Sequence, residues 1–400
     1  MEGPTRIGLR TSSRGDFPRP PWNAGPTPGR VRILLSVQLH HATAREGLQC
    51  EVVDRRGFRK SPRSLHIRKR GSVASDGTPA GPVMESARGQ PLRIAVTGPT
   101  SEFGALLLPR LLAEPRIEQL LTFGPRPVSG ARLVHHRVDL TRWDVESDLE
   151  SALSEAPVDV LYHLAFLHGR TRGAAFAHEL EVIGTLHTLA AAVRAGVRHV
   201  VVPSTTAVYG ARPGNPVMLG EEAELHGSPG SRFVTDRVEV ERQLVTFRRD
   251  HPGVGLTVLR FAPVLGPTVD NPATRYFRRP LVPTLLGFDP LWQAVHEEDA
   301  RELLLGLLDA PVSGTFNVVS DDVLPLSALI RLAGTTPLPL PPPLARATLR
   351  ALNSAGITAT PGALLDYLHY AWVADGSRAR TGLGFRPRFG AREAAASVRS

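Results

Sequence analysis

Strands and helices alternate along most of this sequence, and that alternation limits the fold more than any other feature. Residues 92–98, LRIAVTG, form an apolar run that is rich in β-forming residues and ends in glycine. This is the pattern of a strand buried on both faces. Similar runs follow, separated by helical stretches at residues 145–155, 173–195, 231–250 and 297–309. Alternation at this spacing predicts an α/β fold with a doubly wound parallel sheet.

The first 83 residues do not share this pattern. They contain 15 Lys and Arg against 6 Asp and Glu, are rich in Pro, Gly and Ser, and show no helical or strand period. Such a segment buries too little apolar surface to offset the entropy lost on ordering. We therefore expect residues 1–83 to be a disordered basic tail, or a stretch that precedes the true start of the protein at Met84.

A glycine-containing turn, TGPTSEFG (97–104), follows the first predicted strand and opens the first helix. In that context backbone N–H groups and the positive end of a helix meet a pyrophosphate. Gly98 and Gly104 are spaced for the tight turn and for close packing of helix on strand. The middle position, where a further glycine would let the backbone approach the phosphate, is Ser101. The turn predicts dinucleotide binding.

The alternation loosens after about residue 262 into short helical and Pro-rich pieces. A smaller lobe of this kind packs over the carboxyl ends of the strands, where such folds bind their ligands. The predicted domains are therefore a dinucleotide-binding domain at residues 84–262 and a substrate lobe at residues 263–400. One late strand, at about residues 315–319, is expected to return from the lobe to the sheet.

Composition excludes several other classes of protein. Residues 84–400 contain 32 basic and 32 acidic side chains, and no basic excess for binding nucleic acid remains there. No apolar run approaches the roughly 18–20 residues that cross a membrane. The only cysteine of the sequence is Cys50, which excludes a disulfide and a Cys-based metal site within the chain and fits a reducing compartment such as the cytoplasm. We expect neither nucleic acid nor a membrane as partner.

Seven short strings occur in order between residues 92 and 388. They are TGPTSEFG (97–104), VDL (138–140), YHLA (162–165), GT (184–185), VVPSTTAVYG (201–210), LRFAPVLGP (259–267) and DGSRARTGLGFRP (375–387). Together they resemble the extended short-chain dehydrogenase/reductase (SDR) family, the NAD-dependent epimerase/dehydratase type. The resemblance implies a Rossmann-type fold, NAD or NADP as cofactor, and oxidoreductase or epimerase activity on a nucleotide sugar or another carbonyl compound. It also implies a homodimer through the helices at 173–195 and 231–250, although core packing within one chain explains their apolar stripe equally well.

The resemblance carries the family's cofactor site onto this chain residue by residue. It assigns the pyrophosphate turn to Gly98, Ser101, Glu102, Phe103 and Gly104, the adenine contacts to Asp139 and Leu140, and the ribose contacts to Leu164 and Ala165. At the end of the second strand, where an acidic residue would select NAD, the sequence has Gly124, with Arg126 two residues later. Because an Arg there can pair with a 2′-phosphate, we expect NADP to be preferred over NAD. The alternative is a solvent-exposed Arg in a Pro-rich loop.

The same resemblance places the catalytic positions at Thr205, Phe233 and Arg237, where the family has Ser/Thr, Tyr and Lys. The family's Tyr transfers a proton, and its Lys holds the nicotinamide ribose and lowers the pKa of the Tyr. Phe has no proton to donate, and Arg keeps the positive charge but presents a planar fork. Glu181 and Pro263 also replace Asn residues that are common in the family. We therefore expect the standard Tyr–Lys chemistry to be lost.

Other side chains are candidates for proton transfer by residue type, with packing or helix capping as their alternative role. They are Tyr276, His163, His168 and His296. The His pairs at 40–41 and 135–136 lack the spaced carboxylate or thiol partners of a metal site, so no metal is expected. Two hypotheses of different class follow. The chain is an NAD(P)-dependent oxidoreductase or epimerase in which another acid replaces Tyr, or it is a non-catalytic cofactor-sensing or scaffold protein.

Overall fold

A computed structural model describes residues 90–167, 173–228, 230–354 and 364–399. The predicted tail, residues 1–83, lies outside them. The central sheet of the described part has seven strands that all pair in parallel, in the order β11-β6-β5-β4-β1-β2-β3. Their bounds are β1 (Leu92–Thr97), β2 (Ile117–Gly124), β3 (Leu133–Arg137), β4 (Val160–His163), β5 (His199–Thr205), β6 (Gly255–Phe261) and β11 (Gly314–Val318).

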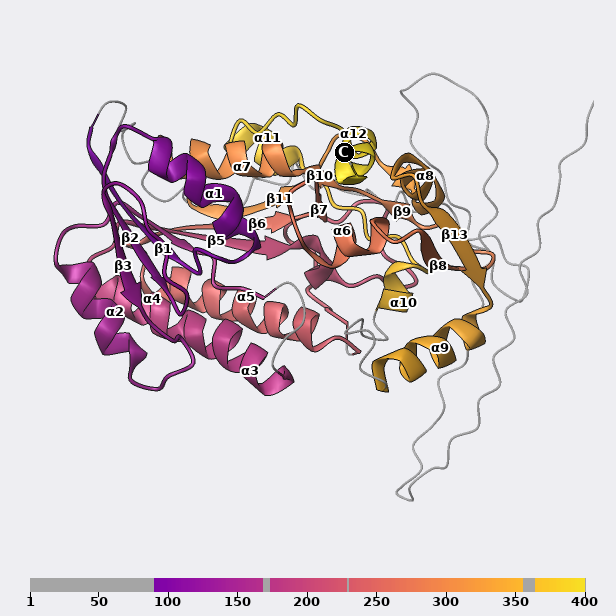
Figure 1. The fold of residues 1–400 in the computed structure, drawn as a ribbon, viewed down its shortest axis with the longest axis horizontal. Coiled ribbons are helices and arrows are strands. Elements are labelled where there is room, and N and C mark those ends of the chain that lie inside the picture. Colours follow the sequence, from indigo (N-terminus) through magenta and orange to yellow (C-terminus); the bar gives the residue numbers. More distant parts are fainter. Residues whose placement is uncertain (1–89, 168–172, 229, 355–363, 400) are drawn as a thin grey trace, which may run out of the picture. The chain divides into compact units, whose positions relative to one another are not determined.

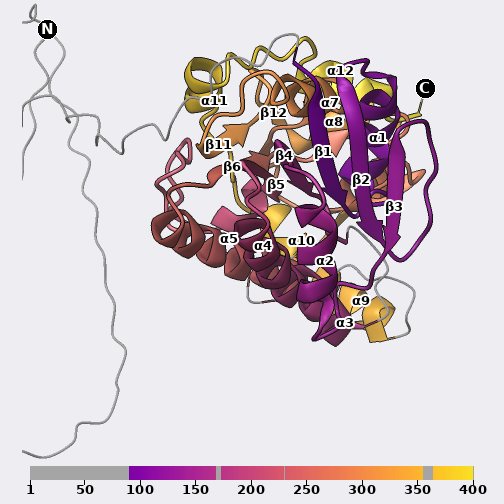
Figure 2. The ribbon, with the colours of Figure 1, turned by 90° about the vertical axis from the view of Figure 1, so that its left-hand side faces the viewer.

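The strand order explains where a ligand would bind. The chain runs outward from β1 to β3 on one side and then crosses back to place β4 on the other side of β1. This is the doubly wound arrangement, in which ligands bind at the carboxyl ends of the strands beside the point where the order reverses. The predicted fold class is confirmed. In Figure 2, β1, β2 and β3 lie side by side on the part of the sheet that faces the viewer.

Helices cover both faces of the sheet (Figure 1). Their bounds are α1 (Glu102–Ala113), α2 (Val145–Ser154), α4 (Gly184–Arg194), α5 (Arg232–Asp250) and α7 (Glu297–Gly306), with α3 (Ala174–His178) and the π-helical segment η1 (Glu179–Ile183) leading into α4. Ile94 and Val96 of β1 pack with residues of α1 and α7, whereas Ala95 packs with residues of α2, α4 and α5. Since both faces of β1 are buried, the strand is apolar at nearly every position rather than at alternate ones.

The remaining elements follow β6 in the sequence, apart from the 3-10 helix η2 after β5, and most of them are short. The helices are η2 (Thr206–Tyr209), α6 (Pro272–Phe277), α8 (Leu326–Leu332), α9 (Pro342–Ser354), α10 (Leu364–Tyr367), α11 (Ser377–Gly382), α12 (Ala391–Ala396) and η3 (Ser397–Arg399). The strands form three pairs, β7 (Val264–Leu265) with β10 (Val295–His296), β9 (Leu291–Trp292) with β12 (Leu324–Pro325), and β8 (Leu281–Leu285) with β13 (Thr336–Leu340). β11 leaves this region and pairs with β6 at the edge of the main sheet. The division into two domains at residue 262 stays a prediction.

β13 pairs with β8 through alternate residues. Thr336 N–H donates to the carbonyl of Pro280, and Leu286 N–H donates to the carbonyl of Leu340. Successive residues of a strand direct their backbone N–H and C=O groups to opposite edges. Thr336 and Leu340 face β8, so the backbone groups of Pro337 and Pro339 face the edge of β13 away from β8.

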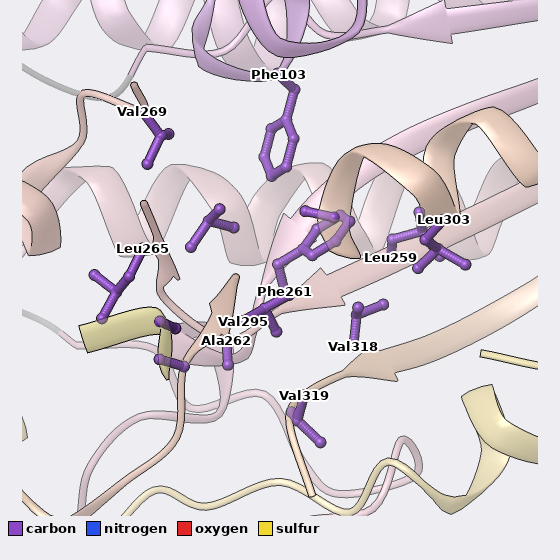
Figure 3. Packing of buried hydrophobic residues seen from close by; sticks show 14 of the residues in the cluster. Phe103, Leu259, Phe261, Ala262, Leu265, Val269, Val295, Leu303, Val318 and Val319 are labelled. Carbon is purple, nitrogen blue, oxygen red and sulfur yellow. The ribbon is translucent and has the colours of Figure 1, made fainter. Parts of the chain in front are cut away.

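An aromatic contact fixes the start of α1 over the sheet. The ring of Phe103, the second residue of α1, lies 4.8 Å from the ring of Phe261 at the end of β6. Figure 3 shows this pair within the buried cluster that also contains Leu265 and Val295. Burial of each aromatic ring contributes about 2–3 kcal/mol, which holds the turn between β1 and α1 in one position. Within the described residues, no helix is both long enough and apolar enough to cross a membrane.

Candidate functional site

The turn at residues 97–104 has no room for a side chain at positions 98 and 104. Gly98 has φ +66°, and a Cβ on it would lie 2.5 Å from the Cα of Ala165. A Cβ on Gly104 would lie 2.2 Å from the carbonyl oxygen of Gly98. Neither approach is compatible with a side chain. The end of β1, the start of α1 and the residues after β4 are therefore in direct backbone contact.

Ser101 occupies the middle position of the turn without blocking it. Its φ of −71° is ordinary for any residue, and its Oγ accepts a hydrogen bond of 3.1 Å from the Gly104 N–H. Ser101 is thus the N-cap of α1, a role for which Ser is well suited. The side chain is directed along the helix, and the positive helix end remains at the carboxyl edge of the sheet.

Glu102, the first residue of α1, has an unusual environment. Its half-buried carboxylate accepts a hydrogen bond of 2.6 Å from Asn271 Nδ2. Burial raises the pKa of Glu102 to about 7, although this hydrogen bond and the positive charges of Arg237 and Arg275 act to lower it. No sequence motif singles out Asn271 as part of the site. An Asn followed by Pro does indicate a helix N-cap, and Asn271 caps α6, but its contact with Glu102 depends on the folded structure.

The other end of the predicted cofactor site lies at β2 and β3. A Cβ on Gly124, the last residue of β2, would lie 3.2 Å from Pro99 Cδ, which leaves little room for an acidic side chain. Arg126 is exposed, and the exposed Arg137 is the register partner of Gly124 across β3. Two arginines therefore flank the place where an acidic residue would select NAD. Sequence analysis missed Arg137 because strand register is not visible in one sequence.

The predicted adenine and ribose residues differ in exposure. Asp139 is exposed and accepts hydrogen bonds from the Thr141 backbone N–H and hydroxyl, at 3.0 and 2.7 Å. Leu140, Leu164 and Ala165 are buried. Ala165 contacts the glycine turn, as described above. Asp139 and Arg126 lie on the solvent side of the site.

The predicted catalytic positions lie at the end of β5 and in the first turns of α5. Thr205 ends β5, and its Oγ1 accepts a hydrogen bond of 3.2 Å from the Ala207 N–H. Ser231 caps α5 by accepting from the Val234 N–H. Phe233 is half-buried, and Arg237 one turn later is fully buried. Arg237 Nη1 donates to the Pro203 carbonyl at 3.4 Å, which places its guanidinium against β5.

Arg237 is held by aromatic rings and by one carboxylate. Its guanidinium carbon lies 3.8 Å from the ring centre of Phe166 and 5.3 Å from that of Phe233. Its Nε lies 3.3 Å from Oε2 of Glu181, which is also buried. Within the described part of the chain, Arg237 Nε and Nη2 and Glu181 Oε2 have no aligned hydrogen-bond partner. These three atoms could therefore form further hydrogen bonds beyond those made within the described residues.

Burial shifts the pKa of both partners toward their neutral forms. It lowers the pKa of Arg237, which the carboxylate of Glu181 acts to raise. It raises the pKa of Glu181, which Arg237 and a hydrogen bond from the Leu167 N–H act to lower. Glu181 lies in η1, and π-helical turns often occur at functional sites because they redirect a side chain.

Comparison with known proteins assigns the chain to a family. The sequence model of the NAD dependent epimerase/dehydratase family matches residues 94–318, which is more than half of the chain. The chain belongs to this family. An uncharacterized protein of Mycobacterium tuberculosis is 33% identical to this epimerase/dehydratase family member over 306 residues, which cover 75% of the chain and 81% of that protein.

Solved structures agree with the family fold. The structure of UDP-glucose 4-epimerase from Thermotoga maritima with UDP-glucose superimposes with a TM-score of 0.59 at 18% identity and covers 77% of this chain and 97% of that one. MoeE5 in complex with UDP-glucuronic acid and NAD gives a TM-score of 0.59 at 21% identity and covers 76% and 97%. At these identities the likeness establishes the fold.

The other side chains considered for proton transfer in this epimerase/dehydratase family member have structural partners. The buried Tyr276 donates to the carbonyl of Pro283 at 2.8 Å, and burial raises its pKa. His163 lies between the hydroxyls of Thr97 and Thr185, and burial lowers its pKa to about 3. His296 caps α7 by accepting from the Glu298 N–H. His168 lies outside the described residues, and among those described no three His, Cys, Asp or Glu side chains gather as a metal site would require.

Proposed function

We propose that this chain binds NAD or NADP through the turn at residues 97–104 and lacks the Tyr-dependent proton transfer of its family. The observation that carries the first part is the backbone contact between Gly98, Gly104 and Ala165, which brings the start of α1 to the carboxyl end of β1, where a pyrophosphate would bind. When bound, the nicotinamide would accept or donate a hydride. The chain's own contribution is to hold the dinucleotide and to position a substrate beside it.

Arg237 supports the proposal at the nicotinamide end. Its Nη2 is buried and has no hydrogen-bond partner within the described part of the chain. A buried donor without a partner is costly, and a ribose hydroxyl would satisfy it. Arg237 is thus proposed to take over the binding role of the family's Lys. Phe233 cannot take over the role of Tyr, because its ring carries no exchangeable proton.

The preference for NADP is part of the same proposal. Pro99 crowds the position of the NAD-selecting acid at Gly124, and Arg126 and Arg137 are exposed on either side. A 2′-phosphate would accept charge-assisted hydrogen bonds from them. The substrate class proposed from the family is a nucleotide sugar or another carbonyl compound, and the proposed location is the cytoplasm. A homodimer through α3–α4 and α5 is proposed on the exposure of Leu186 and Val245, at 45% and 62%.

Calorimetry with NADPH and NADH tests the proposal directly. We expect both to bind, NADPH more tightly, and Arg126→Ser to reduce that difference. Gly98→Ala should abolish binding because its Cβ would collide with the Ala165 backbone. Gly253→Ala is the matched control, since its Cβ would meet nothing within 4 Å. Absence of binding for either dinucleotide would refute the proposal.

A non-catalytic role is the second candidate, and the Phe233–Arg237 pair favours it. Binding of NADPH without turnover on nucleotide sugars, ketones and aldehydes would support a cofactor-sensing or scaffold protein. Turnover that is lost in Thr205→Ala would support an atypical oxidoreductase or epimerase instead. The double variant Phe233→Tyr with Arg237→Lys restores the family's pair and measures whether the remaining site can use it.

A further inference from the structure

Glu102 introduces a negative charge into the turn that the proposed function assigns to a pyrophosphate. It is the first residue of α1 and lies between Ser101 and Phe103, whose backbone forms that turn. A dinucleotide pyrophosphate carries two negative charges. An ionised carboxylate in the same turn repels it, and the repulsion is stronger where water is partly excluded. The turn therefore contains one feature that attracts an anion and one that opposes it.

The Glu102 side chain is held in place rather than free to turn into solvent. Asn271 Nδ2 donates to Glu102 Oε1 at 2.6 Å and also to the Val264 carbonyl at 2.7 Å. Asn271 Oδ1 accepts from the Thr274 N–H at 2.9 Å as the N-cap of α6. The Glu102 carboxyl cannot move away without breaking its bond to this fixed, helix-capping amide. A pyrophosphate that binds at the turn therefore lies near the Glu102 carboxyl in this position.

Charged groups of both signs face Glu102. Arg237 faces it from α5, Arg275 faces it from α6, and Asp270 from the segment before α6 adds a negative charge. The two arginines favour the carboxylate, whereas Asp270 and burial favour the carboxylic acid. Burial is the largest of these effects and raises the pKa of Glu102 to about 7. Both forms of Glu102 are therefore populated near neutral pH.

We propose that binding of a dinucleotide at the turn 97–104 is coupled to protonation of Glu102, so that the protein takes up a proton as the pyrophosphate binds. This inference rests on the proposed function. The neutral carboxylic acid still accepts from Asn271 through its carbonyl oxygen and gains an O–H donor, and it no longer repels the phosphates. Because binding favours the protonated form, protonation must favour binding by the same factor. Affinity consequently falls as pH rises.

Calorimetric titration of NAD⁺ at pH 6, 7 and 8 measures the coupling. NAD⁺ is the suitable ligand because its pyrophosphate does not titrate in this range, whereas a 2′-phosphate titrates near pH 6. A carboxyl of pKa about 7 that must be neutral for binding predicts an affinity about tenfold lower at pH 8 than at pH 6. At pH 7, binding heats in PIPES and in imidazole should differ by the amount that uptake of about half a proton requires.

Two glutamine variants separate Glu102 from other acids. Glu102→Gln should bind with an affinity that does not change between pH 6 and 8 and with equal heats in the two buffers. Glu221→Gln is the matched control, because burial also raises the pKa of Glu221, which accepts from the Asn317 N–H away from the turn. It should keep the wild-type pH dependence.

The outcomes distinguish failure of the proton coupling from failure of dinucleotide binding itself. Binding that is equally tight at pH 6 and 8, or proton uptake that persists in Glu102→Gln, would overturn the coupling and leave dinucleotide binding intact. Failure of NAD⁺ and NADPH to bind at every pH would overturn the proposed function itself. If Glu102→Gln does not fold, the two-buffer measurement on the wild-type protein still decides the coupling.

Discussion

Two buried Arg–Glu pairs meet on α5, one turn apart, and they are built differently. Arg260 of β6 contacts Glu241 through Nε and Nη2, at 2.9 and 2.7 Å. Glu241 also accepts from the Ser204 hydroxyl, and Arg260 Nη1 donates to the Tyr209 hydroxyl. Arg237 instead lies 3.3 Å from a single oxygen of Glu181, without an aligned hydrogen bond.

The difference separates a structural ion pair from the pair that we propose as part of a binding site. The hydrogen bonds that Arg260 donates to Glu241 and Tyr209 raise its pKa despite its burial, whereas burial lowers the pKa of Arg237. A buried pair repays the cost of desolvation only if its polar atoms are satisfied. The Arg260 pair meets that condition inside the protein. The Arg237 pair leaves Nε and Nη2 without hydrogen-bond partners among the described residues, which supports its proposed contact with a ligand.

The largest expected effect is on the satisfied pair. Arg260→Met should lower the free energy of unfolding by about 3–5 kcal/mol, because it leaves Glu241 buried and uncompensated. Urea unfolding at pH 7.5 measures it. Arg242→Met on α5, next to Glu241, is the control, since Arg242 is 67% exposed and pairs with Glu239 at 3.5 Å, and should change stability by less than about 0.5 kcal/mol. A loss below about 1 kcal/mol for Arg260→Met would remove the contrast.

A second effect concerns Glu102, which also faces Arg237. Its pKa is about 7 in the folded protein against 4.5 for a free Glu. A raised carboxyl pKa means that the folded state binds the proton more tightly, so stability is complete below pH 4.5 and is lost as pH rises through 7. Glu102→Gln should therefore be more stable than wild type by about 3 kcal/mol at pH 8 and nearly equally stable at pH 4.5. A difference that is independent of pH would contradict this reasoning.

A smaller effect is expected when the Arg237 pair is removed as a unit. The double variant Arg237→Met with Glu181→Gln should unfold within about 1 kcal/mol of wild type, because no buried charge remains unpaired. Its affinity for NADH should fall about tenfold, the worth of a charged hydrogen bond to a ribose hydroxyl. Calorimetry and urea unfolding on the same samples give both numbers. Loss of stability without loss of affinity would make the pair structural after all.

The smallest effect is expected at Phe233. Phe233→Tyr keeps the ring 5.3 Å from the Arg237 guanidinium, a contact worth about 0.5–1 kcal/mol, and Phe233 is half-buried. Its free energy of unfolding should stay within about 0.5 kcal/mol of wild type. A loss of more than about 1 kcal/mol in urea unfolding would mean that the ring is packed too tightly to carry the hydroxyl.

The sheet could be predicted from the sequence because a strand buried on both faces, such as β1, is a continuous apolar run. Such a run is recognisable whatever residues flank it. The glycine turn was readable for a related reason, since contacts such as Gly104 on the Gly98 carbonyl exclude every other residue. Both signals are local, and local signals survive in a single sequence.

The environment of the site was not readable. Glu102 and Asn271 are 169 residues apart in the sequence, and their contact depends on how α6 packs. The burial of Arg237 was equally hidden, because a charged residue on a helix is usually exposed. The motif positions predicted Phe233 and Arg237 as site residues. The contact between the Phe166 ring and the Arg237 guanidinium is visible only in the folded structure.

The prolines of β13 bear on how this protein behaves at high concentration. A strand at the edge of a sheet offers backbone donors and acceptors to any other chain, and this is a common start of aggregation. On the outer edge of β13 the donors would belong to Pro337 and Pro339, which have no N–H. A strand from another molecule finds carbonyl oxygens there but no donors, and cannot form a regular ladder. The short sheet of β8 and β13 thus remains two-stranded on that side even in a crowded solution.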